Sequence, residues 1–272
     1  MSNRITRILV ALLTIPFLLG LSYWGGIPFL IFILVIGLVS YYEFSTMVKN
    51  KNIFPCYLIG FLSVALIILN SYFNLFPIEL FLLAMFLILL LIELFRNKES
   101  AINNVSATLF GVLYTGLFSA SLIGIREFYI DTPLSYSNGG FIIISIFITL
   151  WMTDSAAYFI GSAIGKHKLF PRVSPNKSWE GAIAGFVFAI ITLVVLKIFL
   201  LDFLNWMDII AFGIIIGIFG QVGDLIESLI KRDAGVKDSS NLIPGHGGIF
   251  DRFDSLLFSA PILFLYMNYF VK

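Results

Sequence analysis

The sequence predicts an all-α membrane protein that crosses the bilayer about nine times and has its N-terminus in the cytoplasm. Of its 272 residues, 59% are hydrophobic and only 12% are charged, and the mean hydropathy is +0.99. Ordinary soluble domains are about half apolar and about a quarter charged. Most of the surface of this chain must therefore face hydrocarbon, and the composition excludes a soluble globular protein.

Nine apolar segments follow from cutting the chain at charged residues and at breaks that contain proline or glycine. Residues 8–42 carry no charge and are too long for one crossing, because a membrane helix needs about 20 residues. Gly25, Gly26 and Pro28 predict a hairpin between two short spans there, and a re-entrant pair is the alternative. The other expected spans comprise residues 53–70, 78–95, 105–125, 140–164, 182–201, 209–230 and 256–271.

The positions of lysine and arginine predict the orientation, since basic connections stay on the cytoplasmic side. With the N-terminus inside, fourteen of the 17 basic residues fall in cytoplasmic segments, and this alternation requires an odd number of crossings. The basic residues 1–7 precede an apolar run without a small-residue cleavage site, so we expect a first anchor rather than a removed signal. Cys56 is the single cysteine, and we expect it to be a small buried residue.

Polar residues are distributed unevenly along the chain. Residues 1–140 have short, plain connections and are predicted to form a scaffold that includes contacts of a dimer. Residues 141–272 contain two long polar connections and are predicted to form a catalytic region that faces the cytoplasm from the inner membrane. A net charge of +1 argues against nucleic acid as a partner. The absence of an internal repeat gives no support to an inverted-repeat transporter.

Asp154 lies inside an expected membrane helix, where an aspartate costs about 2.5–3.5 kcal/mol at the bilayer centre. Such a residue faces a partner or a wet cavity, so we expect Asp154 to bind substrate. A hydrogen bond between helices is the alternative. Gly161 and Gly165 follow with the spacing of small residues that lets two helices pack closely.

The segment from Ser174 to Gly181 comes directly before an expected span. Serine followed by proline predicts a helix start with Ser174 as N-cap and Pro175 at the first helical position. Together with Lys177, such a helix N-terminus would bind an anion. Basic residues that merely anchor the span on the cytoplasmic side would look alike.

The sharpest pattern runs from Asp224 to Asp254. On a helix, Asp224, Glu227 or Ser228, and Lys231 share one face that leads from the membrane to the cytoplasm. Glycines of the following loop, among them Gly247 and Gly248, allow backbone amides to come close to a ligand. Asp251 and Asp254 then present carboxylates at the start of the last span.

These residue types point to phosphate and divalent-metal chemistry at the cytoplasmic membrane face. Mg²⁺ takes oxygen ligands, often one or two carboxylates plus substrate phosphates, and Asp224 and Asp251 suit that role. Lys177, Lys231 and Arg252 would neutralise further phosphate charge. His246 is either a structural loop residue or an acid or base. No Walker A, HExxH or GxSxG pattern occurs, which excludes P-loop nucleotide-binding proteins, zinc proteases of the HExxH type and serine hydrolases of the GxSxG type.

The third segment resembles the signature of phosphatidate cytidylyltransferases, also called CDP-diacylglycerol synthases. The resemblance rests on Lys231-Arg232, Lys237-Asp238, Pro244-x-His246-Gly247-Gly248 and Asp251-Arg252-x-Asp254 at their spacing in this chain. The stretches around Asp154 and residues 166–177 are also similar to that family, so the likeness covers about residues 151–255. Asn176 and Ser178 depart from the glycine and threonine of many members, but asparagine tolerates glycine-like backbone angles and serine keeps the hydroxyl.

The resemblance implies a reaction of CTP with phosphatidate that gives CDP-diacylglycerol and pyrophosphate. It also implies a Mg²⁺ requirement, a potassium ion as second metal and a homodimer in the lipid bilayer. We expect Asp224, Asp251 and Lys231 to be catalytic, with Asp224 and Asp251 as metal ligands. The residues expected to bind substrate are Asp154, Ser174, Lys177, Ser228, Arg232, His246, Gly247, Gly248, Arg252 and Asp254.

Three other functions would account for part of this pattern. A CTP-dependent lipid kinase would release CDP instead of pyrophosphate. A secondary transporter would also carry Asp154 and Asp224 in membrane helices, but it gives no reason for a glycine-rich loop flanked by carboxylates. A structural lipid-binding protein has no need of carboxylates beside a phosphate, which they repel unless a metal intervenes.

Overall fold

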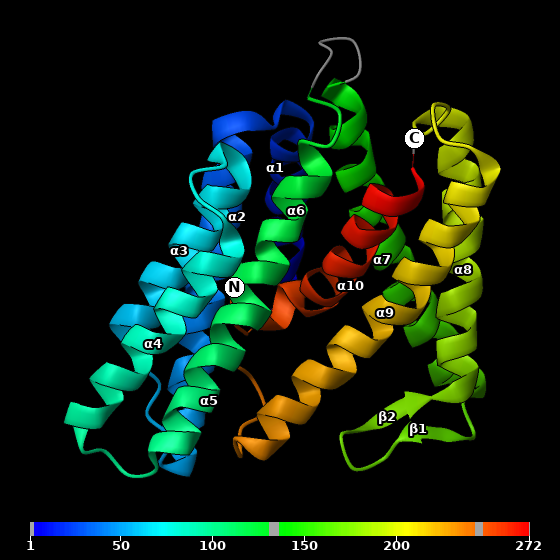
Figure 1. Cartoon of the computed structure of the whole chain (residues 1–272). Coiled ribbons are helices and arrows are strands. Elements are labelled where there is room, and N and C mark those ends of the chain that lie inside the picture. The colour runs from blue at the N-terminus through cyan, green and yellow to red at the C-terminus, as the bar shows by residue number, and fades with distance from the viewer. Residues whose placement is uncertain (1–2, 131–135, 243–246, 272) are drawn as a thin grey trace. The chain divides into compact units, whose positions relative to one another are not determined.

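The computed structural model describes residues 3–130, 136–242 and 247–271, with side chains from residue 12 onward. Helices dominate the described chain, as the sequence predicts, and a short hairpin of two antiparallel strands is the exception (Figure 1). The helices are α1 (Asn3–Trp24), α2 (Gly26–Val48), α3 (Tyr57–Phe73), α4 (Ile78–Arg96), α5 (Ala101–Gly111), α6 (Phe118–Arg126), α7 (Tyr136–Ile164), α8 (Trp179–Phe199), α9 (Trp206–Asp233) and α10 (Ile249–Phe270). The shorter elements are the 3-10 helix η1 (Lys49–Lys51), the π-helix η2 (Val112–Leu117) and the strands β1 (Lys168–Phe170) and β2 (Ser174–Ser178).

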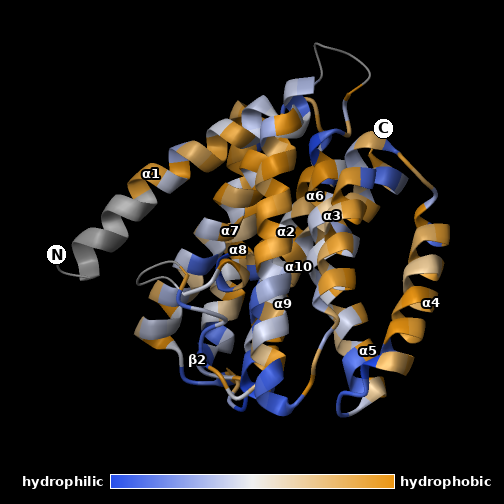
Figure 2. Ribbon diagram, turned by 90° about the vertical axis from the view of Figure 1, so that its left-hand side faces the viewer, coloured by the Kyte–Doolittle hydropathy of each residue, from blue (hydrophilic) through white to orange (hydrophobic). Residues whose placement is uncertain are grey.

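The described residues contain 7 helices that are long and apolar enough to cross a membrane. Two shorter apolar helices, Leu12–Trp24 and Tyr57–Phe73, match the remaining expected spans. Hydrophobic residues run along helices such as α2 and α4, whereas hydrophilic residues gather at the α4–α5 connection and around β2 (Figure 2). The chain is therefore a multi-pass membrane protein. Nine complete crossings and a cytoplasmic N-terminus stay predictions.

The chain divides into two compact units, and the predicted boundary at residue 140 between scaffold and catalytic region stays a prediction. Unit 1 comprises Met1–Phe17, Gly26–Gly124 and Lys231–Phe253. Unit 2 comprises Leu18–Gly25, Ile125–Ile230 and Asp254–Lys272.

Small residues let the helices of unit 1 pack closely. Gly60 of α3 and Gly111 of α5 leave space for the buried ring of Tyr41, which a side chain at either position would overlap. The Tyr41 hydroxyl donates a hydrogen bond of 3.2 Å to the carbonyl of Cys56. Cys56 is itself buried, which confirms its expected character.

A polar cluster holds two basic connections of unit 1 at the same end. Arg96 forms an ion pair of 2.8 Å with Glu93 and donates a hydrogen bond of 2.9 Å to the carbonyl of Phe54. Asn104 donates to Glu93 at 2.7 Å and accepts from the Phe54 amide at 2.7 Å. The α2–α3 and α4–α5 connections therefore lie together, as the charge distribution requires. The membrane side on which they lie stays a prediction.

In unit 2, helix α8 packs against α7 through glycines. A Cβ atom at Gly161 would lie 3.2 Å from the Cα of Gly181, and one at Gly181 would lie 3.1 Å from the Cα of Gly161. A Cβ atom at Gly165 would lie 2.5 Å from Ser178 Oγ. These contacts confirm the close packing predicted for Gly161 and Gly165. The β1–β2 hairpin connects α7 to α8 at this end (Figure 1).

Arg126 is a basic residue outside the expected cytoplasmic segments, and its environment explains the exception. The side chain is buried and donates hydrogen bonds of 2.7 Å to the carbonyls of Ser22 and Tyr23. These carbonyls belong to the last turn of α1, where a helix terminus favours a cation. Gly25 and Gly26 follow with φ of 66° and 55°, so the predicted break between the first two helices is present at these glycines, while their arrangement as a hairpin of two crossings stays a prediction.

Candidate active site

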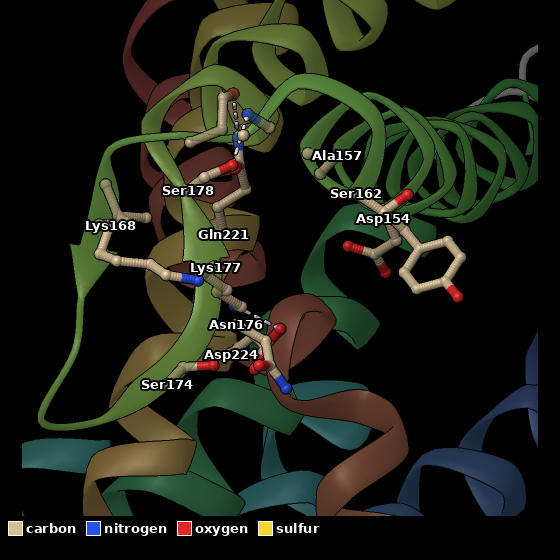
Figure 3. A pocket seen from close by; sticks show the side chains of 16 residues that line it. Asp154, Ala157, Ser162, Lys168, Ser174, Asn176, Lys177, Ser178, Gln221 and Asp224 are labelled. Carbon is tan, nitrogen blue, oxygen red and sulfur yellow. Dashed lines mark hydrogen bonds and ion pairs between the residues drawn. The ribbon is translucent and has the colours of Figure 1, made fainter.

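Unit 2 contains a cavity of about 680 Å³ formed by residues of α7, the β1–β2 hairpin, α8 and α9. Four of the predicted site residues line it (Figure 3): Asp154 from α7, Ser174 and Lys177 from β2, and Asp224 from α9. The further lining residues are Ala157, Tyr158, Gly161, Ser162, Gly165, Lys168, Leu169, Asn176, Ser178, Gly181, Ala182 and Gln221. The cavity therefore combines charged groups with apolar wall positions.

The closest charged contact in this cavity joins Lys177 and Asp224. Lys177 Nζ lies 2.5 Å from Asp224 Oδ2, and the Ser228 hydroxyl donates a long hydrogen bond of 3.4 Å to Asp224 Oδ1. The Lys177 side chain is 29% exposed to solvent and the Asp224 side chain is 35% exposed. An ammonium and a carboxylate thus share one accessible wall, which can serve a phosphate and a cation respectively.

The predicted helix start at Ser174 is wrong. Ser174–Ser178 forms strand β2, α8 begins at Trp179, and Ser178 is the N-cap, whose hydroxyl accepts a hydrogen bond of 3.2 Å from the Gly181 amide. Strand pairing explains why the helix begins later in the sequence than predicted, because Ser178 still pairs with Lys168 in the hairpin. Lys177 therefore reaches the cavity from a strand, one residue before the N-cap.

Three carboxylates of unit 2 come together near the cavity wall. Carboxylate oxygens of Asp224, Glu227 and Asp254 all lie within 4.8 Å of one another, and Glu227 is fully buried. Oxygen donors at this separation could hold a divalent metal ion. Asp224 and Asp254 were predicted site residues, whereas Glu227 was expected only as a neighbour on the same helix face.

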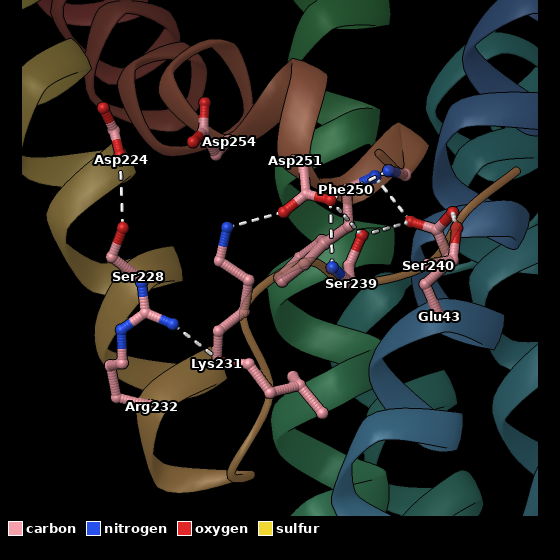
Figure 4. A network of polar contacts seen from close by, with 12 residues as sticks. Glu43, Asp224, Ser228, Lys231, Arg232, Ser239, Ser240, Phe250, Asp251 and Asp254 are labelled. Atoms are coloured by element: carbon pink, nitrogen blue, oxygen red, sulfur yellow. Dashed lines mark hydrogen bonds and ion pairs between the residues drawn. The ribbon is translucent and has the colours of Figure 1, made fainter. Parts of the chain in front are cut away.

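Asp251 is the centre of a second cluster, in unit 1 (Figure 4). Its Oδ1 lies 2.6 Å from Lys231 Nζ. Its Oδ2 accepts hydrogen bonds from the Ser239 amide at 2.9 Å and the Gly248 amide at 2.8 Å, and it lies 2.8 Å from the Ser239 hydroxyl, whose one hydrogen is shared between Asp251 and Glu43. The loop amide of Gly248, predicted to approach a ligand, is thus directed at a carboxylate of the chain itself. Gly247 makes the turn with φ of 81°.

The remaining predicted residues have separate surroundings. Arg232 is exposed and donates a hydrogen bond of 2.9 Å to the carbonyl of Val236, and Arg252 is exposed. His246 lies outside the described residues. Asp224 and Asp251 belong to different units, so their role as joint metal ligands stays a prediction.

Glu43 of α2 is a polar residue that the sequence argument missed. Its side chain is 1% exposed, and its carboxylate accepts hydrogen bonds from Ser239, Ser240 and the first amides of α10. A signal was present, because Glu43 is the only charged residue in the sequence of α2. A carboxylate in an apolar helix has a specific partner as a rule.

Comparison with known proteins gives a consistent result over almost the whole chain. The profile of the family described as "Cytidylyltransferase family" matches residues 5–270. Phosphatidate cytidylyltransferase of Bacillus subtilis is 34% identical over 272 residues, which cover 97% of each chain. The proteins of that name from Staphylococcus haemolyticus and Staphylococcus aureus are 36% and 34% identical over 265 and 266 residues, 96% of each chain.

Proposed function

The chain belongs to the cytidylyltransferase family, and we propose that it transfers the cytidylyl group of CTP to phosphatidate. The products are CDP-diacylglycerol and pyrophosphate. The likeness to phosphatidate cytidylyltransferases extends over 96–97% of the chain, which supports this reaction over the chemistry of other nucleotide-dependent enzymes.

The observation that carries the proposal is the cavity of unit 2. It brings Lys177 and Asp224 to one wall at 2.5 Å, beside the acidic group of Asp224, Glu227 and Asp254. A nucleoside triphosphate needs cations around its phosphates and oxygen ligands for the metal that accompanies it. A phospholipid also needs apolar walls, and residues such as Ala157, Leu169 and Ala182 line the same cavity.

In this reaction a phosphate oxygen of phosphatidate attacks the α-phosphorus of CTP. The new P–O–P bond forms as the bond to the β-phosphate oxygen breaks, and pyrophosphate leaves with the electron pair. Such a displacement needs alignment and charge stabilisation more than covalent help. Lys177 would bind phosphate from β2, and Lys231, Arg232 and Arg252 would add positive charge at the cytoplasmic ends of α9 and α10.

The lysines of both clusters are paired with carboxylates before substrate arrives. Lys177 contacts Asp224 at 2.5 Å, and Lys231 contacts Asp251 at 2.6 Å. Each pair keeps its buried or half-buried charges compensated. We propose that the ammonium groups turn to substrate phosphate when the carboxylates take up a metal cation. Asp251 could make this exchange through Oδ1, because its Oδ2 already accepts hydrogen bonds from two loop amides.

The metal is proposed to be Mg²⁺, with K⁺ as a second cation. Asp224 and Asp254, together with Glu227, offer the oxygen ligands, and Asp251 is a further proposed ligand. Bound there, Mg²⁺ would neutralise the negative charge that grows on the phosphates as the bond to pyrophosphate breaks. Ser228 would orient Asp224, and Asp154, Ser174, Gly247, Gly248 and His246 would contact substrate.

We also propose that the enzyme works as a homodimer in the inner membrane with its site open to the cytoplasm. CTP is water-soluble whereas phosphatidate stays in the bilayer, so the site must be reached from both. The basic residues at the β1–β2 hairpin and at the end of α9 support a cytoplasmic position.

Labelled substrate tests the reaction directly. Purified protein in detergent with phosphatidate, Mg²⁺ and CTP labelled at the α-phosphate should move the label into lipid, and label at the γ-phosphate should appear in pyrophosphate. A CTP-dependent lipid kinase would instead carry the γ-label into lipid and release CDP. Failure of both labels to reach lipid or pyrophosphate under any cation condition would refute an enzymatic function.

A further inference from the structure

We infer that Glu43, on the second helix of the chain, is a positioning residue for the loop that carries the family signature. The inference rests on the proposed function, because its consequence for catalysis depends on that loop. It assigns a role in the reaction to a part of the chain in which no motif was recognised.

The Glu43 carboxylate has four hydrogen-bond donors and is almost completely shielded from solvent. Its Oε1 accepts from the Ser240 hydroxyl at 2.5 Å and the Ile249 amide at 3.1 Å. Its Oε2 accepts from the Phe250 amide at 2.7 Å and lies 3.0 Å from the Ser239 hydroxyl, whose one hydrogen it shares with Asp251. Each oxygen therefore joins one residue of the loop to one residue of α10 (Figure 4).

The two amides belong to the first turn of α10, which begins at Ile249. The first amides of a helix have no partner within the helix, and an N-cap side chain usually accepts from one of them. Gly248 stands in the position before the helix and has no side chain to do so. Glu43 supplies the missing acceptor from another helix, and its negative charge is favoured at a helix N-terminus.

Asp251 completes the cap from inside the helix. Its Oδ2 accepts from the Gly248 amide at 2.8 Å, which is the contact that the third helical residue makes in a capping box. The same oxygen accepts from the Ser239 amide at 2.9 Å, and the Ser239 hydroxyl, which has one hydrogen to donate, lies within hydrogen-bond distance of both Asp251 Oδ2 and Glu43 Oε2, so Ser239 connects Asp251 with Glu43. Displacing Glu43 would therefore loosen Asp251 and, through the 2.6 Å ion pair, Lys231.

The glycine at position 248 is explained by the same arrangement. A Cβ atom there would overlap the Glu43 carboxylate and the Ser239 hydroxyl. The signature glycine thus leaves room for Glu43, and backbone freedom alone does not account for it, because Gly248 has no positive φ.

Glu43→Gln is the decisive variant, since it keeps the side-chain shape and replaces one acceptor oxygen by an NH₂ donor that faces hydrogen-bond donors. Glu93→Gln is the matched control. Glu93 is also a buried glutamate of unit 1, 7% exposed, and it accepts hydrogen bonds from Arg96 and Asn104 at the α4–α5 end. It has no proposed part in the reaction.

Two measurements separate positioning from general stability. Glu43→Gln should lower kcat by about 10- to 100-fold, with KM for CTP changed less than about threefold, because hydrogen bonds to a charged group are lost while Lys177 is untouched. Hydrogen exchange should become faster in the peptide that contains Ile249 and Phe250. Glu93→Gln should speed exchange around Asn104 and leave kcat within about twofold.

The outcomes distinguish this inference from the proposed function. Wild-type protein that makes no CDP-diacylglycerol would refute the function, while exchange at Ile249 and Phe250 would still test the cap. If the wild type is active, a Glu43→Gln variant that is equally active, or that shows unchanged hydrogen exchange at the start of α10, would overturn the positioning role. If Glu43→Gln does not fold, Ser240→Ala removes one donor alone, and normal exchange and kcat in that variant would overturn the role as well.

Discussion

Replacing Asp224 by asparagine separates a catalytic carboxylate from a structural one. The substitution keeps the volume of the side chain and removes its charge. Asp224 takes part in the ion pair with Lys177, in the contact with Ser228 and in the acidic group with Glu227 and Asp254. The contacts with Lys177 and Ser228 contribute to stability, whereas the acidic group would bind the proposed metal.

The expected loss of stability is small. The side chains of Lys177 and Asp224 are 29% and 35% exposed to solvent. Ion pairs that water reaches contribute about 0.2–1 kcal/mol to the free energy of unfolding. The hydrogen bond from Ser228 is 3.4 Å long and adds little. Thermal unfolding in detergent should therefore occur within about 4 °C of the wild type.

The expected loss of activity is large by comparison. Removing a charged metal ligand should raise the barrier by several kcal/mol, which corresponds to a fall in kcat of roughly 10²-fold or more. Release of pyrophosphate measures kcat at saturating CTP and phosphatidate over a range of Mg²⁺ concentrations. The fall should persist at high Mg²⁺.

Asp208→Asn provides a control on the same helix. Asp208 lies in the first turn of α9, is 4% exposed and accepts a hydrogen bond of 2.9 Å from the Tyr266 hydroxyl. The same chemical change there should lower stability by about 1 kcal/mol and leave kcat unchanged. An Asp224→Asn variant that keeps more than a tenth of wild-type kcat, or that loses activity only in proportion to its folded fraction, would refute the metal-ligand assignment.

Three further predictions concern phosphate binding, the packing of the signature loop and the topology. Lys177→Met should lower kcat/KM by about 10- to 150-fold through weaker phosphate binding. It should also reduce the Mg²⁺ concentration needed for half-maximal activity, because Asp224 loses its ammonium partner. Unchanged kcat and KM for both CTP and phosphatidate would contradict this. Gly248→Ala should lower both the unfolding temperature and kcat, since overpacking costs about 1–3 kcal/mol, and a variant equal to wild type in both would show that the loop has room. In a cysteine-free background, Arg172→Cys should react with an impermeant reagent only from the cytoplasmic side and Asp202→Cys only from the other, and labelling of both from one side would break the predicted alternation.

Much of the fold was predictable from local properties of the chain. Apolar length and charged breaks indicated each helix, and Gly25 and Gly26 indicated the turn between the first two. These features depend on neighbouring residues, because burial in hydrocarbon and helix geometry act on each segment separately. The helix start at Ser174 was wrong because pairing of Ser178 with Lys168, a contact between strands, overrode a local capping signal.

The residues that could carry chemistry were also predictable as a set, because charged groups in membrane helices and glycine-rich polar loops are unusual enough to stand out. Their partners were not. Lys177 meets Asp224 across 47 residues of sequence, and Glu43 meets Ser239 across 196. A carboxylate's charge is a property of its residue type, but the donors that hold it are chosen by which helices pack together. Sequence therefore determined that this chain spans a membrane and handles phosphate, and only the tertiary structure decided that the cap of α10 is supplied by α2.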